Sequence, residues 1–360
     1  MNIGFWNFYN FYNKNRMLSD SSSVVGEELA YFIVQLTKQL RQLGHHVATI
    51  DMQDPESFDK IFFLDYPTKF NSRFRKLVRR RHPELHLILI EPPIIRPDNY
   101  DVRKHRPFKT VLTWKKDLCV SDPQKYRLYH IPNRVRSGNF STIPFSQRKL
   151  CTVINSFMVS VRANELYSER VRAIRWFEAH APKDFDLIGT EWDKPLFSGR
   201  LSALNLGIRF AYRRVTWLNR LKTRRFPSHI GPNRKPKHLT LHDYRFCIAY
   251  ENSIELDYIS EKIFDSFFSG CVPIYLGAPN ILDSIPKDTF IDKRGFATYD
   301  EVYRYISRLS ENEYNRYLNN IDSFLKSPGL QPFTVEGFIQ TFISNYFDPL
   351  HNQPSDSIPS

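Results

Sequence analysis

Short apolar runs alternate with amphipathic stretches along the first third of the chain. An apolar run at 3–8 is followed by residues 24–43, which place apolar side chains at helical spacing until Gly44 ends the pattern. A second apolar run follows within 43–51. The pattern continues with apolar runs in 60–67, 85–93, 110–114 and 127–133, and with the basic helical stretch 72–81. Strands that alternate with helices in this way predict a parallel, doubly wound α/β sheet.

A second alternating series begins after the polar stretch 141–150, which is typical of a linker. We expect strands in 151–157, 184–189, 244–251, 272–277 and 289–296, and helices over 164–181, 260–269, 299–309 and 311–325. The chain is therefore predicted to form two Rossmann-like domains, residues 1–145 and 146–345, followed by a polar tail at 346–360. Two such domains would place a ligand in a cleft between them, at the carboxyl ends of the strands.

The composition is that of a globular protein of the reducing cytoplasm. Of 360 residues, 41% are hydrophobic and 25% are charged, and no apolar run is long enough to span a membrane. The N-terminus lacks the basic and apolar regions of a signal peptide. The four cysteines form no CxxC pair, and three lie in or beside apolar runs, so we interpret them as buried free thiols.

Positive charge is concentrated in one segment. The net charge is +13, and twelve lysines and arginines lie between Asp193 and Asp243 without a single acidic residue. Such a block indicates either an anionic partner, namely nucleic acid, a membrane surface or a phosphorylated substrate, or a solvated insertion. Within it, residues 209–226 interleave cations with aromatic and aliphatic side chains. This composition predicts a helix that either lies on an anionic membrane or packs on the second domain.

The stretch 251–277, ENSIELDYISEKIFDSFFSGCVPIYLG, predicts a loop, a helix that begins after Ser260, and a buried strand. Lys262 lies in the first turn of this helix, where free backbone N–H groups already favour negative charge. A lysine there indicates a phosphate site, and Glu261 could accept hydrogen bonds from sugar hydroxyls. The neighbouring neutral polar groups suit a nucleotide-sugar: Asn252, Ser253, Tyr258 and Ser260.

Residues 244–281 closely resemble the signature of the bacterial α-1,3-fucosyltransferases of glycosyltransferase family ten. The pattern is Glu-Asn, a variable loop, Tyr-x-Ser-Glu-Lys, a helix, and then Val-Pro-Ile-Tyr with a following glycine. The stretches 87–100, 164–178 and 185–193 resemble members of the family at the expected places. The resemblance implies a GT-B fold with two Rossmann-like domains facing a central cleft. It also implies that the second domain holds GDP-fucose and the first binds the acceptor.

The resemblance also implies roles for individual residues. Lys262 would contact the pyrophosphate and Glu261 the fucose, while Asn252 and Tyr258 would line the donor pocket. A phosphate-binding arginine maps to Arg170, with Arg162 as the competing alignment, and Glu251 would bond the loop backbone. Lys262 and the arginine would neutralise the leaving diphosphate, so no metal should be strictly required.

The general base of the transfer is predicted to be Glu91. It ends an apolar strand and precedes Pro92-Pro93, so the chain must turn at the sheet edge, and it resembles the catalytic glutamate of the family. Strand-end residues that could border the acceptor or donor pocket are Asp65, Trp114 and Trp192.

The predicted function is inverting transfer of L-fucose from GDP-fucose to a glycan acceptor. The acceptor hydroxyl would be the 3-OH of GlcNAc or Glc, for example in lipopolysaccharide O-antigen. Two alternatives are a transferase for another GDP-sugar and a basic nucleic-acid-binding protein, although the second leaves the Glu-Asn and Glu-Lys constellation without a role. We therefore expect no nucleic-acid partner, and a cytoplasmic enzyme that attaches peripherally to the membrane through 209–226.

Overall fold

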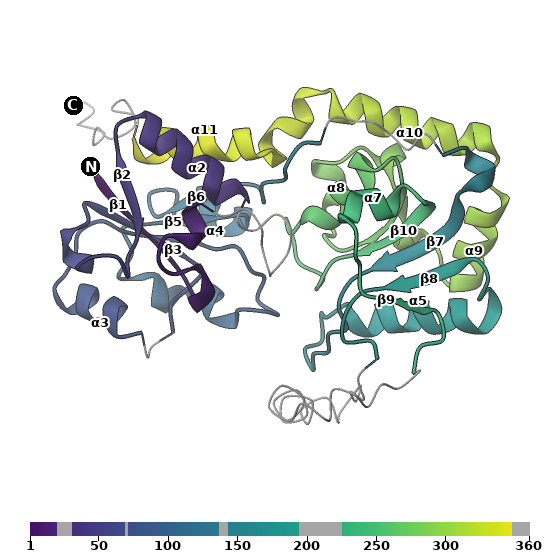
Figure 1. Ribbon diagram of the computed structural model, residues 1–360, viewed down its shortest axis with the longest axis horizontal. Coiled ribbons are helices and arrows are strands. Elements are labelled where there is room, and N and C mark those ends of the chain that lie inside the picture. The colour runs from purple at the N-terminus through teal and green to yellow at the C-terminus, as the bar shows by residue number, and fades with distance from the viewer. Residues whose placement is uncertain (20–30, 69–70, 137–142, 194–224, 348–360) are drawn as a thin grey trace. The chain divides into compact units, whose positions relative to one another are not determined.

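The computed structural model divides the chain into two compact units, residues 1–135 with 330–360, and residues 136–329. It describes residues 1–19, 31–68, 71–136, 143–193 and 225–347. Each unit is built on a six-stranded sheet in which all paired strands are parallel (Figure 1). The two predicted Rossmann-like domains are thereby confirmed.

The sheet of the first unit has the order β2-β1-β3-β4-β5-β6. Its strands are β1 (Asn2–Asn7), β2 (His46–Thr49), β3 (Lys60–Leu64), β4 (Leu85–Ile88), β5 (Thr110–Thr113) and β6 (Tyr126–Leu128). Its helices are α1 (Arg16–Ser19), α2 (Tyr31–Gln42), α3 (Ser72–Arg79), α4 (Lys116–Ser121) and α11 (Val335–Tyr346). Strand β1 lies in the interior of the sheet, between β2 and β3. The residues that follow β1 begin at the carboxyl edge of this sheet.

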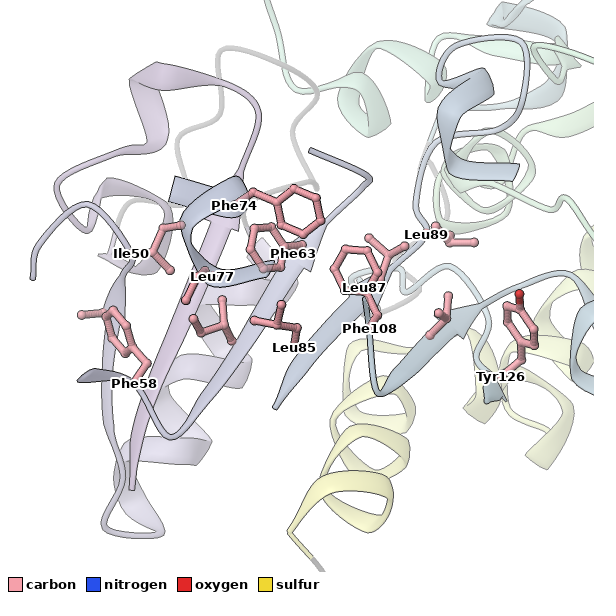
Figure 2. Close-up of a cluster of buried hydrophobic side chains, with 13 residues drawn as sticks. Ile50, Phe58, Phe63, Phe74, Leu77, Leu85, Leu87, Leu89, Phe108 and Tyr126 are labelled. Carbon is pink, nitrogen blue, oxygen red and sulfur yellow. The ribbon is translucent and has the colours of Figure 1, made fainter. Parts of the chain in front are cut away.

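The two faces of this sheet are covered by different parts of the chain. One face buries a cluster drawn in Figure 2, in which Phe63 and Leu87 from the sheet meet Phe74 from α3. On the other face, Phe62 lies 4.7 Å from Phe342 and 4.8 Å from Tyr346 of α11, measured between ring centroids. Helix α11, at the yellow end of the chain, lies beside α2 (Figure 1).

The position of α11 corrects the predicted domain boundaries. Residues 330–345 were assigned to the second domain, but they belong to the first unit, and the first boundary lies at 135/136 rather than at 145/146. The predicted tail also began one residue too early, because Tyr346 is helical and buried. The hydrophobic side chains of α11 complete the core of a sheet whose strands lie more than two hundred residues earlier in the chain.

The second unit has the strand order β12-β11-β10-β7-β8-β9. Its strands are β7 (Lys149–Ile154), β8 (Phe185–Ile188), β9 (His229–Gly231), β10 (Tyr244–Tyr250), β11 (Val272–Leu276) and β12 (Ile291–Asp292). Its helices are α5 (Tyr167–His180), α7 (Lys237–Leu241), α8 (Glu261–Phe268), α9 (Tyr299–Arg308) and α10 (Glu311–Leu325). Capping boxes fix the starts of α9 and α10, which explains why these two helices begin where the sequence predicts.

The predicted membrane-binding segment 209–226 lies outside the described residues up to position 224. Its last residue, Phe226, is buried and packs against Trp192, with ring centroids 5.0 Å apart. The end of this segment therefore packs on the second unit. In the described parts of the chain, no helix is both long enough and apolar enough to cross a membrane.

Candidate functional site

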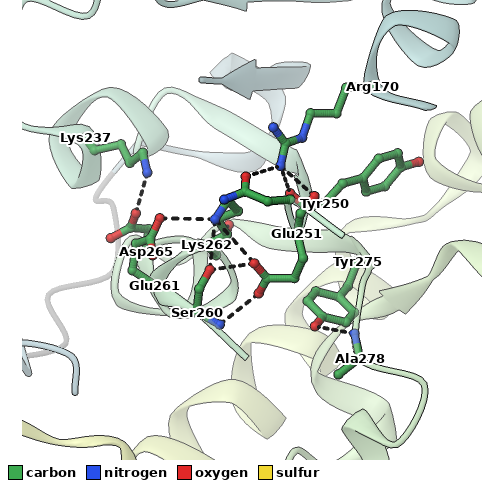
Figure 3. Close-up of polar contacts among 12 residues, drawn as sticks. Arg170, Lys237, Tyr250, Glu251, Ser260, Glu261, Lys262, Asp265, Tyr275 and Ala278 are labelled. Atoms are coloured by element: carbon green, nitrogen blue, oxygen red, sulfur yellow. Dashed lines mark hydrogen bonds and ion pairs between the residues drawn. The ribbon is translucent and has the colours of Figure 1, made fainter. Parts of the chain in front are cut away.

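Glu251 organises the start of α8 from the carboxyl end of β10. Its side chain is fully buried, and its carboxylate accepts hydrogen bonds from the Ser260 backbone N–H at 2.8 Å and from the Ser260 hydroxyl at 2.6 Å (Figure 3). Ser260 does precede α8 as predicted, but its hydroxyl binds Glu251 and does not cap the helix. The predicted backbone-bonding role of Glu251 is confirmed.

Gly277 allows Glu251 to lie this close to the strand β11. A Cβ atom at position 277 would stand 2.4 Å from Cγ of Glu251 and 2.5 Å from the Tyr275 hydroxyl oxygen. Real Cβ contacts are not this short, so only glycine fits without a shift of its neighbours. The signature glycine after Val-Pro-Ile-Tyr therefore has a packing role.

Lys262 is held at the start of α8 by three oxygen atoms. Its Nζ lies 2.9 Å from the Ser260 hydroxyl, 3.3 Å from Glu251 Oε2 and 3.3 Å from Glu261 Oε1. The side chain is 17% exposed, so its ammonium group is fixed in position yet still reachable from solvent. A fixed cation beside free helical N–H groups is suited to binding a phosphate.

A second lysine, Lys237 of α7, adds to the positive potential around Glu261. Its Nζ lies 2.7 Å from Asp265 Oδ2 on the next turn of α8. Burial alone would raise the pKa of Glu261, but the charges of Lys262 and Lys237 outweigh it and lower the pKa to about 2. Glu261 is therefore ionised at neutral pH. Lys237 was not among the predicted site residues, although the acid-free segment that contains it was noted.

Arg170 is buried beneath this loop. The guanidinium Nη2 donates to the carbonyls of Tyr250 and Glu251, both at 2.6 Å, and to Asn252 Oδ1 at 3.1 Å. Its side chain is 4% exposed, and burial lowers its pKa. Arg170 thus ties helix α5 to the end of β10.

Arg162 differs from Arg170 because its side chain is exposed. It belongs to the loop that follows β7, the neighbour of β10 in the sheet. This loop pairs with the loop after β10, through a bridge between Glu165 and Ser253 and a 2.8 Å hydrogen bond from the Ile254 N–H to the Asn164 carbonyl. Arg162 is therefore the solvent-accessible arginine of the two predicted candidates.

The remaining predicted donor residues are brought together in this loop with different exposures. Asn252 is half-buried, and its amide oxygen accepts from Arg170. Ser253 is fully buried, its hydroxyl has no hydrogen-bond partner among the described residues, and Tyr258 is 4% exposed. The side chains of Ser253 and Tyr258 thus lie inside the second unit, and Asn252 is the member of this set nearest to solvent.

Glu91 lies in the first unit, in the turn after β4. Buried Asp65 holds this turn, because its Oδ1 accepts from the N–H groups of Ile90 at 2.7 Å and Glu91 at 3.2 Å and from Asn99 Nδ2 at 2.7 Å. Burial outweighs these hydrogen bonds and raises the pKa of Asp65 to about 6. The Glu91 carbonyl also accepts from Tyr100 at 3.1 Å, so this turn is anchored at several points.

Asp65, Trp114 and Trp192 were predicted to border a pocket. All three side chains are at most 2% exposed. Asp65 and Trp114 support the Glu91 turn, since the Trp114 indole donates to the Ile90 carbonyl at 3.2 Å. Both residues thus hold this turn through its backbone.

One Asp-x-Asp sequence, Asp184-Phe185-Asp186, occurs in the chain. Asp186 binds Lys149 and the Tyr244 hydroxyl, each at 2.6 Å, and Asp184 accepts from the Tyr303 hydroxyl at 2.8 Å. These residues stand at the amino end of β8, opposite the loops after β7 and β10. Within the described ranges, no group of three or more acidic, histidine or cysteine side chains is placed to hold a metal ion.

The part of the chain that matches a known family contains β10, the loop that follows it and α8. Residues 222–326 match the model described as glycosyltransferase family 10 (fucosyltransferase) C-term. The chain is similar to GDP-fucose protein O-fucosyltransferase 3 of Gallus gallus, at 34% identity over 28% of this chain and 25% of the relative. It is also similar to the alpha-(1,3)-fucosyltransferase FucT of Helicobacter pylori, at 34% identity over 25% of this chain and 19% of the relative. The chain thus spans about a quarter or less of the length of these relatives.

Solved structures share the fold over almost the whole chain. An alpha1,3-fucosyltransferase crystal structure superposes with a TM-score of 0.53 at 13% identity, covering 96% of this chain and 89% of that one. The same enzyme class with GDP-fucose gives 0.51 at 14% identity, over 97% and 91%. A glycosyltransferase from Rickettsia africae gives 0.56 at 10% identity, over 98% and 99%. The predicted GT-B fold class, with two Rossmann-like domains, is confirmed.

Proposed function

We propose, from the match of residues 222–326 to the model described as glycosyltransferase family 10 (fucosyltransferase) C-term, that this chain transfers L-fucose from GDP-fucose to a hydroxyl group of a glycan. The observation that carries this proposal is the start of α8, where buried Glu251 fixes Ser260 and Lys262. A fixed ammonium group beside helical N–H groups suits the diphosphate of a nucleotide-sugar. Ionised Glu261 in the same turn suits the hydroxyl groups of the sugar.

We assign the second diphosphate cation to Arg162 and a positioning role to Arg170. The guanidinium of Arg170 is buried and donates to two backbone carbonyls, whereas Arg162 is exposed on the loop paired with residues 252–254. A diphosphate carries its charge on exposed oxygen atoms, which need cations that can reach them. Arg162 and Lys262 would neutralise the leaving diphosphate, and a divalent metal would at most stimulate the reaction.

The proposed reaction is a single displacement with inversion. The acceptor hydroxyl oxygen forms a bond to the anomeric carbon of fucose while the bond from that carbon to the diphosphate oxygen breaks. GDP leaves with the bonding electron pair, and the hydroxyl proton passes to the carboxylate of Glu91. Support for Glu91 is its place at the carboxyl edge of the first unit's sheet, on a turn that Asp65 holds from beneath.

The acceptor that we propose is the 3-OH of GlcNAc or Glc in a glycan, for example lipopolysaccharide O-antigen. Transfer from another GDP-sugar is the alternative within the same site. One similar protein is named a protein O-fucosyltransferase, so a serine- or threonine-containing peptide belongs in the acceptor panel. Donor choice and acceptor choice can be tested separately, because the donor loop belongs to the second unit alone.

Two substitutions test the proposal. Lys262→Ala should weaken GDP binding by roughly tenfold to a hundredfold, because one charge-assisted phosphate contact is worth roughly 1.5–3 kcal/mol. Glu91→Gln should keep GDP affinity but lower fucose transfer by roughly a hundredfold or more. Isothermal titration with GDP and transfer assays with labelled GDP-fucose measure the two effects. Wild-type GDP affinity in folded Lys262→Ala would contradict the donor site, and wild-type transfer by Glu91→Gln would contradict the base.

We also propose that residues 209–226 attach the protein to an anionic membrane surface. Support is the composition of the segment, seven cations interleaved with aromatic and aliphatic residues, since each cation near such a surface contributes about 1 kcal/mol. Replacing Arg213, Arg214, Arg224 and Arg225 by glutamine should abolish sedimentation with anionic vesicles. Equal recovery of wild type and this variant in the soluble fraction when anionic vesicles are sedimented would favour a helix packed on the second unit, as Phe226 is.

A further inference from the structure

A pocket opens at the carboxyl edge of the first unit's sheet, outside the residues assigned above. Its volume is about 330 Å³, at the lower end of the range for small-molecule sites. Its walls come from the end of β1 and the segment 8–13, from residues 49–51 after β2, and from the first turn of α3. All of these elements belong to the first unit.

The pocket combines aromatic faces with uncharged amides. Trp6 and Phe8 are half-buried, which leaves part of each ring accessible, and Asn10 and Asn13 follow them along the same wall. The wall also includes one carboxylate, of Asp51, and one guanidinium, of Arg73, so neither charge dominates. Apolar rings suit the C–H face of a sugar, and amides can both donate to and accept from its hydroxyl groups.

The loop beside this pocket is held in an unfavourable backbone conformation. Lys14 and Asn15 have φ values of 57° and 60°, although neither is glycine. The Lys14 N–H donates to Asp51 Oδ2 at 2.8 Å, and Asn15 exchanges hydrogen bonds with Thr49 through both backbone and side chain. Two successive left-handed residues cost free energy, and such strain persists where surrounding contacts fix a functional shape.

The same aromatic segment contacts the turn that carries Glu91. The guanidinium of Arg96, which follows this turn, lies 4.4 Å from the centre of the Phe8 ring. The Tyr9 ring contacts the Phe8 ring at a tilt of 41°, with centroids 3.9 Å apart, and burial together with the charge of Glu91 raises the pKa of Tyr9. A molecule in the pocket would therefore lie next to the residues that surround the proposed base.

We propose that this pocket binds a neutral sugar unit of the acceptor, with the half-buried ring of Trp6 as the stacking platform and Asn10 and Asn13 as hydrogen-bonding partners. The inference rests on the proposed function, since it identifies where a glycan acceptor is recognised. It selects a neutral sugar over an anionic one, because Asp51 would repel an anion that Arg73 attracts. It assigns acceptor specificity to the segment 6–13.

The test compares two pocket variants, Trp6→Ala and Asn10→Ala, with the control Asn319→Ala, an exposed asparagine of α10 in the second unit. Fucose transfer and direct binding would be measured on an array of neutral, acidic and phosphorylated oligosaccharides and one serine- and threonine-rich peptide. For the neutral glycan that serves as acceptor, KM should rise roughly five- to tenfold in each pocket variant. The kcat value and the GDP affinity should stay within about twofold of wild type.

Trp6→Ala removes a contact with Phe63, whose ring centroid lies 5.7 Å away, and could loosen the fold, whereas Asn10 is exposed. The result for Asn10→Ala therefore decides if the first variant unfolds. Wild-type KM in Asn10→Ala, or transfer only to acidic glycans or to the peptide, would overturn the pocket assignment while leaving the transferase in place. A protein that binds no GDP-fucose and modifies no acceptor would instead refute the proposed function.

Discussion

Replacing Arg170 by methionine is expected to destabilise the second unit. Methionine is similarly long and unbranched, but it removes the donors to the carbonyls of Tyr250 and Glu251 and to Asn252. Nη2 has two hydrogens for these three acceptors, so about two charge-assisted bonds are lost, at roughly 1.5–3 kcal/mol each. The cost of burying the guanidinium, which lowers its pKa, is relieved in the variant. The net loss should be roughly 2–4 kcal/mol.

This loss can be measured by thermal unfolding. For a unit of this size, 1 kcal/mol lowers Tm by roughly 2–4 °C, so Arg170→Met should lower Tm by roughly 5–15 °C. Arg172→Met is the matched control on the same helix, because the ion pair of Arg172 with Glu169 is exposed and should contribute about 0–1 kcal/mol. Arg162→Met should keep the wild-type Tm and weaken GDP binding roughly tenfold or more. A wild-type Tm for Arg170→Met would refute the positioning role.

Three further outcomes follow from the described contacts. The pKa of Asp65 is raised in the folded protein, so the folded protein binds more protons than the unfolded chain between about pH 4 and pH 6. The contribution of Asp65 to the free energy of unfolding therefore falls as pH rises through that window. In urea titrations, the free energy of unfolding of Asp65→Asn minus that of wild type should therefore increase from about pH 4 to pH 6. A difference that stays constant across these pH values would contradict this. Gly277→Ala should lower Tm, at a cost of roughly 1–3 kcal/mol, because its Cβ would collide with Glu251; an unchanged Tm would show that the strand shifts freely. Fucose transfer should persist in a chelator within about twofold, and a loss restored by a divalent metal would contradict the cation roles of Arg162 and Lys262.

The strands and most helices could be predicted because their own residues specify them. Residues 246–250 of strand β10 form a continuous apolar run, and α10 has a serine and a glutamate spaced as a capping box. Helix α11 was not predicted, and residues 330–345 were assigned to the wrong unit because the partners of this helix are remote in sequence. Phe342 packs on Phe5 and Phe62, and no local pattern indicates which sheet a terminal helix will cover.

The candidate site was predictable where short-range order fixes it. Glu251, Ser260 and Lys262 are within twelve positions, and their contacts follow from the turn between β10 and α8. The sequence favoured Arg170 over Arg162 as the phosphate-binding arginine, and we propose the reverse. The sequence could not decide between them, because both are arginines in the same region of the chain. What separates them is burial, which depends on how α5 packs against the end of β10.

The charged side chains around α8 hold one another in place at the proposed phosphate site. Lys262 pairs with the carboxylates of Glu251 and Glu261, and Lys237 pairs with that of Asp265. These side chains are therefore already ordered before a ligand binds. Fixed charges avoid the cost of reorganisation at the moment when the leaving diphosphate gains negative charge. The carboxylates also oppose a bound diphosphate, and this repulsion falls hardest on GDP, which carries more charge than the intact nucleotide-sugar. Under the proposed function, a site arranged in this way would position the donor without holding the product more tightly than turnover allows.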